Sequence, residues 1–253
     1  MRRGETHRTL ITLLLAVALV GCGDETLEIL GNSEPDAETC RWRGAQDGPF
    51  SEQGVMDIWL TKRYVVAPVV RNNSDPSRSA RKREAAVNID GAHVTFTSAA
   101  PAIAAVLQPE LFIPVGAVVF PNGVTTVPFS VIFESLGRQL ENTSLFDERG
   151  ATVDILAQIR FEGTTLGGSE VTSDTFTYPI TICAGCLLDH TTPPLFDDDD
   201  GSLTCDVSKA PPETPNLTDF ASVCVYGQDD PVDCRLCRGV TGDPTASDVI
   251  CDP

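Results

Sequence analysis

Basic residues are scarce in this chain. It has 18 Lys and Arg against 36 Asp and Glu, and its formal net charge is −18 over 253 residues. Such a charge repels phosphate backbones, so nucleic acid is not an expected partner. It favours cations such as Ca²⁺, or basic surfaces. The content of 42% hydrophobic and 21% charged residues is typical of a globular chain.

The usual signatures of catalysis are also missing. The sequence has no Gly-x-Ser-x-Gly elbow, no His-Glu-x-x-His motif and no phosphate-binding glycine loop. It has three histidines, of which His7 lies in the leader, and its carboxylates are too numerous for any pair to be informative. We therefore predict a protein that is not an enzyme and needs no cofactor. An envelope hydrolase, which would have to use His93 or His190, is a weaker alternative.

No apolar run is long enough to cross a bilayer. The longest, Leu10 to Val20, is interrupted only by Thr12 and is too short for a hydrocarbon core of about 30 Å. It follows Arg2, Arg3 and Arg8, as the apolar region of a signal peptide follows its positive one. Residues 1–21 are therefore expected to be a signal peptide.

The end of this run, Leu19-Val20-Gly21-Cys22, resembles the lipobox of bacterial lipoproteins. The resemblance implies cleavage before Cys22, a diacylglyceryl thioether on its sulfur and acylation of its new amine. Several acyl chains hold a protein firmly on a membrane, whereas one holds it only marginally. Asp after the lipidated Cys retains enteric lipoproteins at the inner membrane, so Gly23 favours the outer membrane. We expect a lipid-anchored, extracytoplasmic protein of the cell envelope.

Eight further cysteines are even in number and, after export, would lie in an oxidising compartment. Both facts favour disulfides, four at most, whose connectivity the spacing leaves open. Seven of the eight lie in the last 71 residues, where apolar periodicity is poor and cross-links stabilise most. The disulfide candidates are Cys40, Cys183, Cys186, Cys205, Cys224, Cys234, Cys237 and Cys251.

Metal binding is the main alternative. Cys183, Cys186 and His190 with Cys205 form a plausible zinc ligand set. The run Asp197–Asp200 offers clustered oxygens for Ca²⁺, although it does not fit the EF-hand pattern. Disulfides and a solvated acidic linker are the favoured interpretations of these two features, so no metal ligand is assigned.

The chain divides into four parts. After the signal peptide, residues 22–39 are rich in acids, have little that could pack, and are expected to be a tether. Residues 40–183 have the pattern of strands, and residues 184–253 form a loop-rich region broken by proline pairs. We expect this last region to be stapled by disulfides against the strand domain.

Apolar residues alternate with polar ones in three segments, which end at Phe133, Phe161 and Ile182. The run Tyr64–Val70 is apolar on both faces and is expected to be a covered central strand. In residues 87–96 the apolar phase slips at Gly91-Ala92, which indicates a bulge or bend.

Two turns are expected between strands: a hairpin at Asn122-Gly123 and a turn over Thr164–Ser169. Only a turn or two of helix is expected, over Leu136–Leu145. These patterns predict a mainly β fold, an antiparallel sandwich of immunoglobulin-like architecture.

Five basic residues are clustered in one expected loop between residues 71 and 83. An exposed, solubilising loop is the simplest interpretation; docking to anionic lipid, to lipopolysaccharide or to the chain's own acidic tail are the functional ones. Among these we favour the tail, because it is held at high effective concentration. The residues are Arg71, Arg78, Arg81, Lys82 and Arg83.

Four segments of the mature chain carry a second resemblance: Tyr64–Val70 with Asn72-Asn73, Ile89–Val94, Cys183–Leu188 and Gly227–Cys234. Their layout is similar to that of uncharacterised exported lipoproteins of myxobacteria and their relatives. The resemblance implies a compartment and a layout but no activity. We predict a non-enzymatic binding or structural module, anchored through Cys22, with an envelope protein or polysaccharide as its partner.

Overall fold

The structure is a computed structural model in which residues 26–36, 40–42, 48–75, 84–189, 225, 227–230 and 232–233 are described. The described chain is mainly β, with short helices α1 (Pro101–Ala104) and α2 (Glu134–Glu141) and a 3₁₀ turn, η1 (Ser144–Phe146). The strands are β1 (Leu27–Ser33), β2 (Phe50–Ser51), β3 (Gly54–Asp57), β4 (Tyr64–Val66), β5 (Pro68–Asn72), β6 (Val87–Ser98), β7 (Leu111–Val119), β8 (Val124–Thr126), β9 (Phe129–Ile132), β10 (Thr152–Thr165), β11 (Glu170–Thr172), β12 (Phe176–Cys183), β13 (Leu188–Asp189) and β14 (Val232–Asp233).

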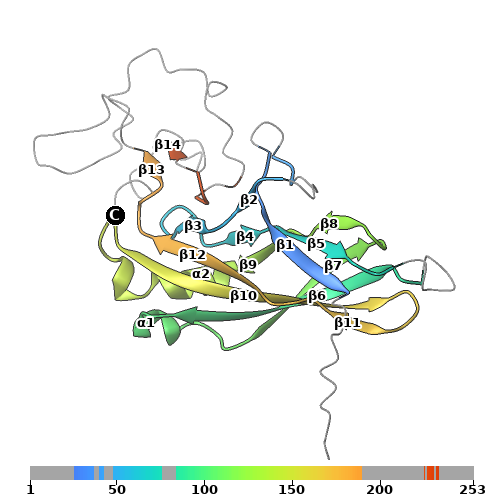
Figure 1. Cartoon of the computed structure of the whole chain (residues 1–253). Coiled ribbons are helices and arrows are strands. Elements are labelled where there is room, and N and C mark those ends of the chain that lie inside the picture. The colour runs from blue at the N-terminus through green and yellow to red at the C-terminus, as the bar shows by residue number, and fades with distance from the viewer. Residues whose placement is uncertain are drawn as a thin grey trace, which may run out of the picture.

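Two sheets make up most of the β domain, and Figure 1 shows the smaller one lying over the larger. The larger has the order β3-β12-β10-β6-β7, with β11 added beside β10, and the smaller has the order β2-β1-β5-β8. A separate ladder joins β4 to β9. All of these pairings are antiparallel except that of β3 with β12, which is parallel. The mainly β, antiparallel prediction is therefore confirmed, and the exceptions among the named strands are β3 with β12 and the separate pair β13 with β14.

One hydrophobic core joins the two sheets. On β10, the residues Ile155, Ala157, Ile159 and Phe161 are all fully buried, and they share this core with residues of β1 and β5. The Phe161 ring meets that of Phe129 from β9 edge to face, with centroids 5.9 Å apart. The period-two alternation predicted a strand with one face on a core, and the burial of β10 confirms it.

The predicted acidic tether over residues 22–39 is wrong for residues 27–33, because these form β1 and pair with β5. Leu27 is fully buried and Ile29 nearly so. Between them, Glu28 faces outward, where its carboxylate bonds Arg71 of β5. The apolar alternation of this strand is short and lies among acidic residues, so the composition of the segment predicted a tether and not a strand. The β domain thus begins at residue 27 and not at residue 40.

The Asn122-Gly123 turn does not close a hairpin. Before the turn, β7 pairs with β6; after it, β8 pairs with β5 in the other sheet. The turn therefore moves the chain from one layer to the other. The sequence signal identified the turn correctly but could not identify the partners of the flanking strands.

The run Tyr64–Val70 forms two strands with different partners, because β4 pairs with β9 whereas β5 lies between β1 and β8. The central, covered position predicted for the run holds for β5. The phase slip predicted in residues 87–96 is also confirmed, since the β6–β7 register shifts between Ile89 and Gly91. In β10, which pairs with the other side of β6, the register shifts between Glu162 and Gly163.

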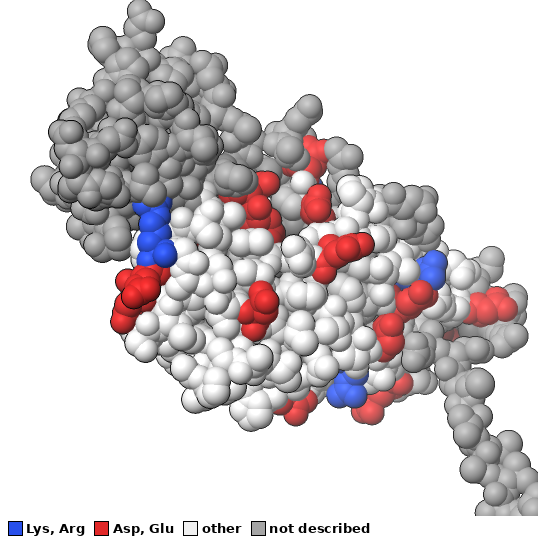
Figure 2. All heavy atoms as spheres, turned by 60° about the vertical axis from the view of Figure 1, so that its left-hand side comes forward, with Lys and Arg blue, Asp and Glu red and all other residues white. Residues whose placement is uncertain are grey.

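Helices contribute little to the fold. α2 spans eight residues, slightly more than the turn or two predicted, and Gly137 lets it approach the loop after β3, where an added Cβ would lie 2.1 Å from the Lys62 carbonyl oxygen. Among the described residues, no helix has the length and apolar character needed to cross a membrane. The acidic side chains visible on one face of the molecule are scattered and do not gather into one patch (Figure 2).

Candidate functional site

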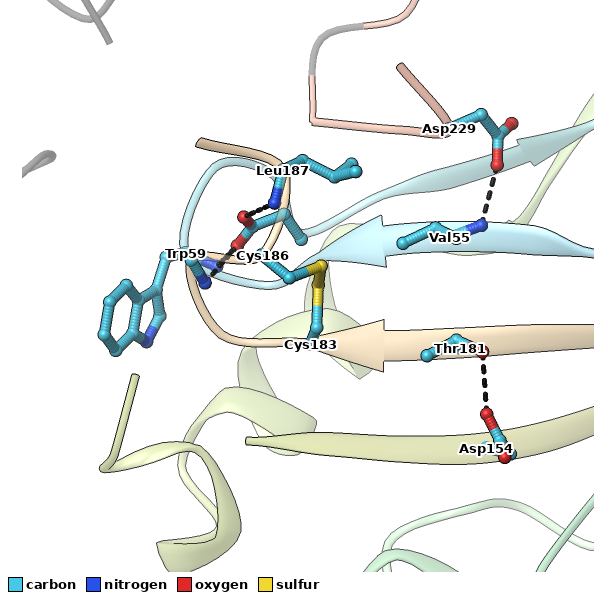
Figure 3. Close-up of a disulfide and its surroundings, with 10 residues drawn as sticks. Val55, Trp59, Asp154, Thr181, Cys183, Cys186, Leu187 and Asp229 are labelled. Atoms are coloured by element: carbon cyan, nitrogen blue, oxygen red, sulfur yellow. Dashed lines mark hydrogen bonds between the residues drawn. A yellow bond between two sulfur atoms is a disulfide. The ribbon is translucent and has the colours of Figure 1, made fainter. Parts of the chain in front are cut away.

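The Cys183–Cys186 pair lies where β12 ends and forms a disulfide (Figure 3). Cys183 is fully buried, whereas Cys186 is exposed. Cys40 is disulfide-bonded as well. The predicted use of these three cysteines in disulfides is thus observed, while Cys22, Cys205, Cys224, Cys234, Cys237 and Cys251 lie outside the described residues.

Asp57 organises the loop between the two cysteines. Its carboxylate is fully buried and accepts hydrogen bonds from the backbone N–H groups of Gly185 (2.9 Å), Leu187 (2.9 Å) and Trp59 (3.1 Å). The carboxylate therefore links the loop after β3 to the segment after Cys183, and Figure 3 shows Trp59 and Leu187, two of its three donor residues. Gly185 has φ +69° and lies under the Trp59 ring, where an added Cβ would be 2.9 Å from it. Three donors therefore hold this carboxylate in place.

These groups are also the described ones best placed to hold a metal ion. One carboxylate oxygen of Asp57 and the sulfurs of Cys183 and Cys186 all lie within 4.8 Å of one another. A disulfide offers no thiolate, however, and the thiolate is the ligand that zinc needs. The predicted alternative would therefore require the reduced pair. Its other ligands, His190 and Cys205, and the Asp197–Asp200 run lie outside the described residues.

A second polar cluster attaches the segment 227–230 to the β domain. The Asp229 N–H donates to the Val55 carbonyl at 2.8 Å, and the Val55 N–H donates to the Asp229 carboxylate at 2.7 Å. Gln228 pairs with both the N–H and the carbonyl of Val65, at 2.9 and 2.7 Å. This segment thus bonds the backbones of both β3 and β4, and sequence patterns did not predict this attachment.

Tyrosine hydroxyls complete this cluster. The buried Tyr64 hydroxyl donates to the Asp229 carboxylate at 2.9 Å and lies 3.4 Å from the Tyr178 hydroxyl, which contacts Ser51 at 2.9 Å. Asp229 is exposed as a residue, but its carboxylate is turned towards these groups, and burial raises the pKa of that carboxyl. Burial, and then the charge of Asp229, raises the pKa of Tyr64 well above its usual range. The tyrosine is therefore a neutral donor at physiological pH.

His93 is held between two carboxylates on the outer face of the larger sheet. Its Nδ1 lies 3.1 Å from Glu110 and its Nε2 lies 2.7 Å from Glu162. Its ring also packs on Phe112, with centroids 5.2 Å apart. His93 is part of β6, between the buried residues Ala92 and Val94. Both ring nitrogens already have carboxylate partners, and no described contact places a nucleophile beside the ring, so this geometry does not support a catalytic base among the described residues.

Asn72 is the polar centre of the opposite end of the domain. Its backbone bonds the 122–123 turn in both directions, at 2.9 and 3.0 Å. Its fully buried side chain donates to the carbonyls of Ala85 (2.9 Å) and Val119 (3.1 Å). The next residue, Asn73, donates its N–H to the Thr26 carbonyl at 2.8 Å. The Asn72-Asn73 pair therefore joins both sheets to the start of the described chain.

Of the predicted basic cluster, only Arg71 is described, and it bonds Glu28 on β1. Arg78, Arg81, Lys82 and Arg83, and most of the tail proposed as their partner, lie outside the described residues. The sequence matches no family model and no curated protein.

Proposed function

We propose that this chain is a lipid-anchored, extracytoplasmic protein of the cell envelope, with Cys22 as its acylated residue. The observation that carries the proposal is the Leu19–Cys22 lipobox, which follows a short apolar run with a positive start. It is supported by the start of β1 at Leu27, which attaches a folded domain within a few residues of Cys22. The outer membrane is the proposed location.

The proposed role is that of a non-enzymatic binding or structural module, with an envelope protein or polysaccharide as its partner. The β domain is proposed to have immunoglobulin-like sandwich architecture, in which rigid sheets present loops and edge strands. The described polar groups with the most partners support a structural use: Asp57 holds the disulfide loop, Asn72 joins the sheets and Asp229 attaches a distant segment.

The test is expression of the full chain in a bacterial host that processes lipoproteins, followed by intact mass measurement. We expect a mature chain that begins at Cys22, carries acyl groups and partitions into detergent. Cys22→Ser is the control and should give an unacylated chain that leaves the detergent phase. An unacylated wild-type chain, or one cleaved elsewhere, would contradict the proposal.

A metal-binding protein is the second candidate, favoured by the position of Asp57 beside the two sulfurs. The protein would be made in the oxidising periplasm, and its thiols alkylated before and after denaturation and reduction. If thiols react on denaturation alone and a metal mass leaves with the fold, this candidate replaces the disulfide interpretation. Thiols that react only after reduction would exclude it for these cysteines.

A further inference from the structure

The start of the described chain and the turn between β7 and β8 lie at the same end of the molecule. Asn73 bonds the Thr26 carbonyl, and its neighbour Asn72 bonds both Asn122 and Gly123 of the turn. The Phe120–Gly123 turn is closed by the Gly123 N–H on the Phe120 carbonyl at 2.8 Å, and Asn122 has φ +56°. It therefore holds its first residue rigidly at the tip.

Large apolar side chains are exposed at this end. Phe120 is 65% exposed, the highest value among the large described hydrophobics, and Leu166 on the β10–β11 turn follows at 60%. The two tips are neighbours through β6, because Leu166 N–H donates to the Ala86 carbonyl and Val87 pairs with Val119. Residues 111–133, which contain the first tip, include no charged side chain although the chain is strongly acidic. Grouped apolar exposure of this kind marks a contact surface.

We propose that this end of the β domain, with Phe120 and Leu166 at its tips, contacts the surface of a phospholipid bilayer. This inference rests on the proposed acylation of Cys22. Residues 23–26 separate that anchor from β1, and four extended residues reach at most about 14 Å. A bilayer that holds the anchor is then within that reach of the end that carries the two tips. Phe and Leu side chains enter the boundary between headgroups and acyl chains in peripheral proteins.

Three acidic residues at this end have partners, whereas Glu170, in the hairpin that carries Leu166, is exposed. Glu28 accepts from Arg71 and from Asn73, and these bonds lower the pKa of its carboxyl. Asp75, which follows β5, and Glu84, which precedes β6, are each engaged by other groups. No described acid of these three therefore stands free to oppose an anionic surface.

If the amino-terminal end contacts the bilayer, the disulfide end faces away from it. β10 runs from Thr152, paired with Cys183, to Thr165, paired with Val87. At about 3.3 Å per residue its length is on the order of 40 Å. The disulfide loop and Asp229 would thus project away from the bilayer, where a soluble partner can reach them.

The test compares two tryptophan variants of the full acylated chain, Phe120→Trp and Leu145→Trp. Leu145 is the matched control because it is 40% exposed and lies in η1 at the disulfide end, where the next residue, Phe146, accepts from the Trp59 indole. Each protein is placed in vesicles of phosphatidylcholine and phosphatidylglycerol with brominated acyl chains, and wild-type fluorescence is subtracted. We expect the bromines to quench the indole introduced at position 120 and to shift its emission to the blue. The indole introduced at position 145 should be unchanged.

A second arm separates this proposal from that of acylation. The mature chain with Cys22 replaced by a hexahistidine segment is held on vesicles that contain a nickel-chelating lipid. Quenching of position 120 in this arm alone, without acylation in the first, would overturn the proposed function and support the contact surface. If the nickel-chelating vesicles quench neither introduced indole, or quench both equally, the contact surface itself is overturned. Shielding of position 120 that rises with protein concentration in the absence of vesicles also overturns it, in favour of a second copy of the chain.

Discussion

The two ends of the β domain use polar groups in the same way but present different surfaces. At the disulfide end, the buried Asp57 carboxylate accepts from three backbone N–H groups, and the loop is closed by Cys183–Cys186. At the amino-terminal end, the buried Asn72 amide joins Ala85 and Val119. The two most exposed large apolar residues of the described chain, Phe120 and Leu166, both lie at the amino-terminal end. The difference indicates that one end is closed for stability and the other is arranged for contact.

The largest effect is expected from Asp57→Ala. The change leaves three backbone donors without their charged acceptor in a buried site, which should lower the free energy of unfolding by about 4 kcal/mol. Asp154→Ala is the matched control, because Asp154 is an exposed carboxylate that accepts from Thr181 alone among the described side chains (2.7 Å). Its cost should stay below about 1 kcal/mol. Urea unfolding with the disulfides intact measures both, and equal costs would mean that Asp57 does not organise its end.

Asn72→Ala tests the corresponding centre at the amino-terminal end. It leaves one buried and one partly buried carbonyl without the amide donor, and the expected loss is about 2–3 kcal/mol. Asn88→Ala serves as the control, since Asn88 is exposed and bonds only Asp90 among side chains (2.9 Å). Amide hydrogen exchange should show faster exchange at Gly123 in the first variant. If the 122–123 turn keeps wild-type exchange, the two sheets are joined there by other contacts.

The two ends should also respond to pH with opposite sign. Burial raises the pKa of Asp229, so the folded state binds more protons than the unfolded one between the ordinary and the raised value. The stability that Asp229 contributes is thus present below the ordinary Asp pKa of about 3.9. It is lost as the pH rises through the raised pKa of the folded state. Bonds from Asn73 and Arg71 lower the pKa of Glu28, so its stabilisation is present above the ordinary value and is lost as the pH falls through the lowered one.

The measurement is urea unfolding of Asp229→Asn and Glu28→Gln from acidic to neutral pH. Relative to wild type, the first variant should gain stability as the pH rises, and the second should lose it. The second slope should be small, with a total below about 1 kcal/mol, because Glu28 and Arg71 are partly exposed. Slopes of the same sign would refute the contrast between the two ends.

Patterns of residue type predicted the strands well and the two ends poorly. The alternation in β10 and the phase slip in β6 each depend on near neighbours in the chain, so they are visible in the sequence. The role of Asp57 depends on residues 128 and 130 positions away, and that of Gln228 on a strand 163 positions away. In so acidic a chain, one aspartate that accepts three N–H groups has the same local signature as a solvated one. β1 was missed because its short apolar alternation lies among acidic residues.

The smallest effect on stability is expected from Phe120→Ser. Because the side chain is 65% exposed, its loss should change the free energy of unfolding by less than about 0.5 kcal/mol. Phe129→Ser, which removes a 7% exposed ring packed on Phe161, should cost about 3–5 kcal/mol. Thermal unfolding distinguishes the two, and a large cost at position 120 would mean that the ring belongs to the fold. A ring that the fold does not need, held rigidly at the tip of a closed turn beside the start of the chain, is better explained by contact with another surface than by packing.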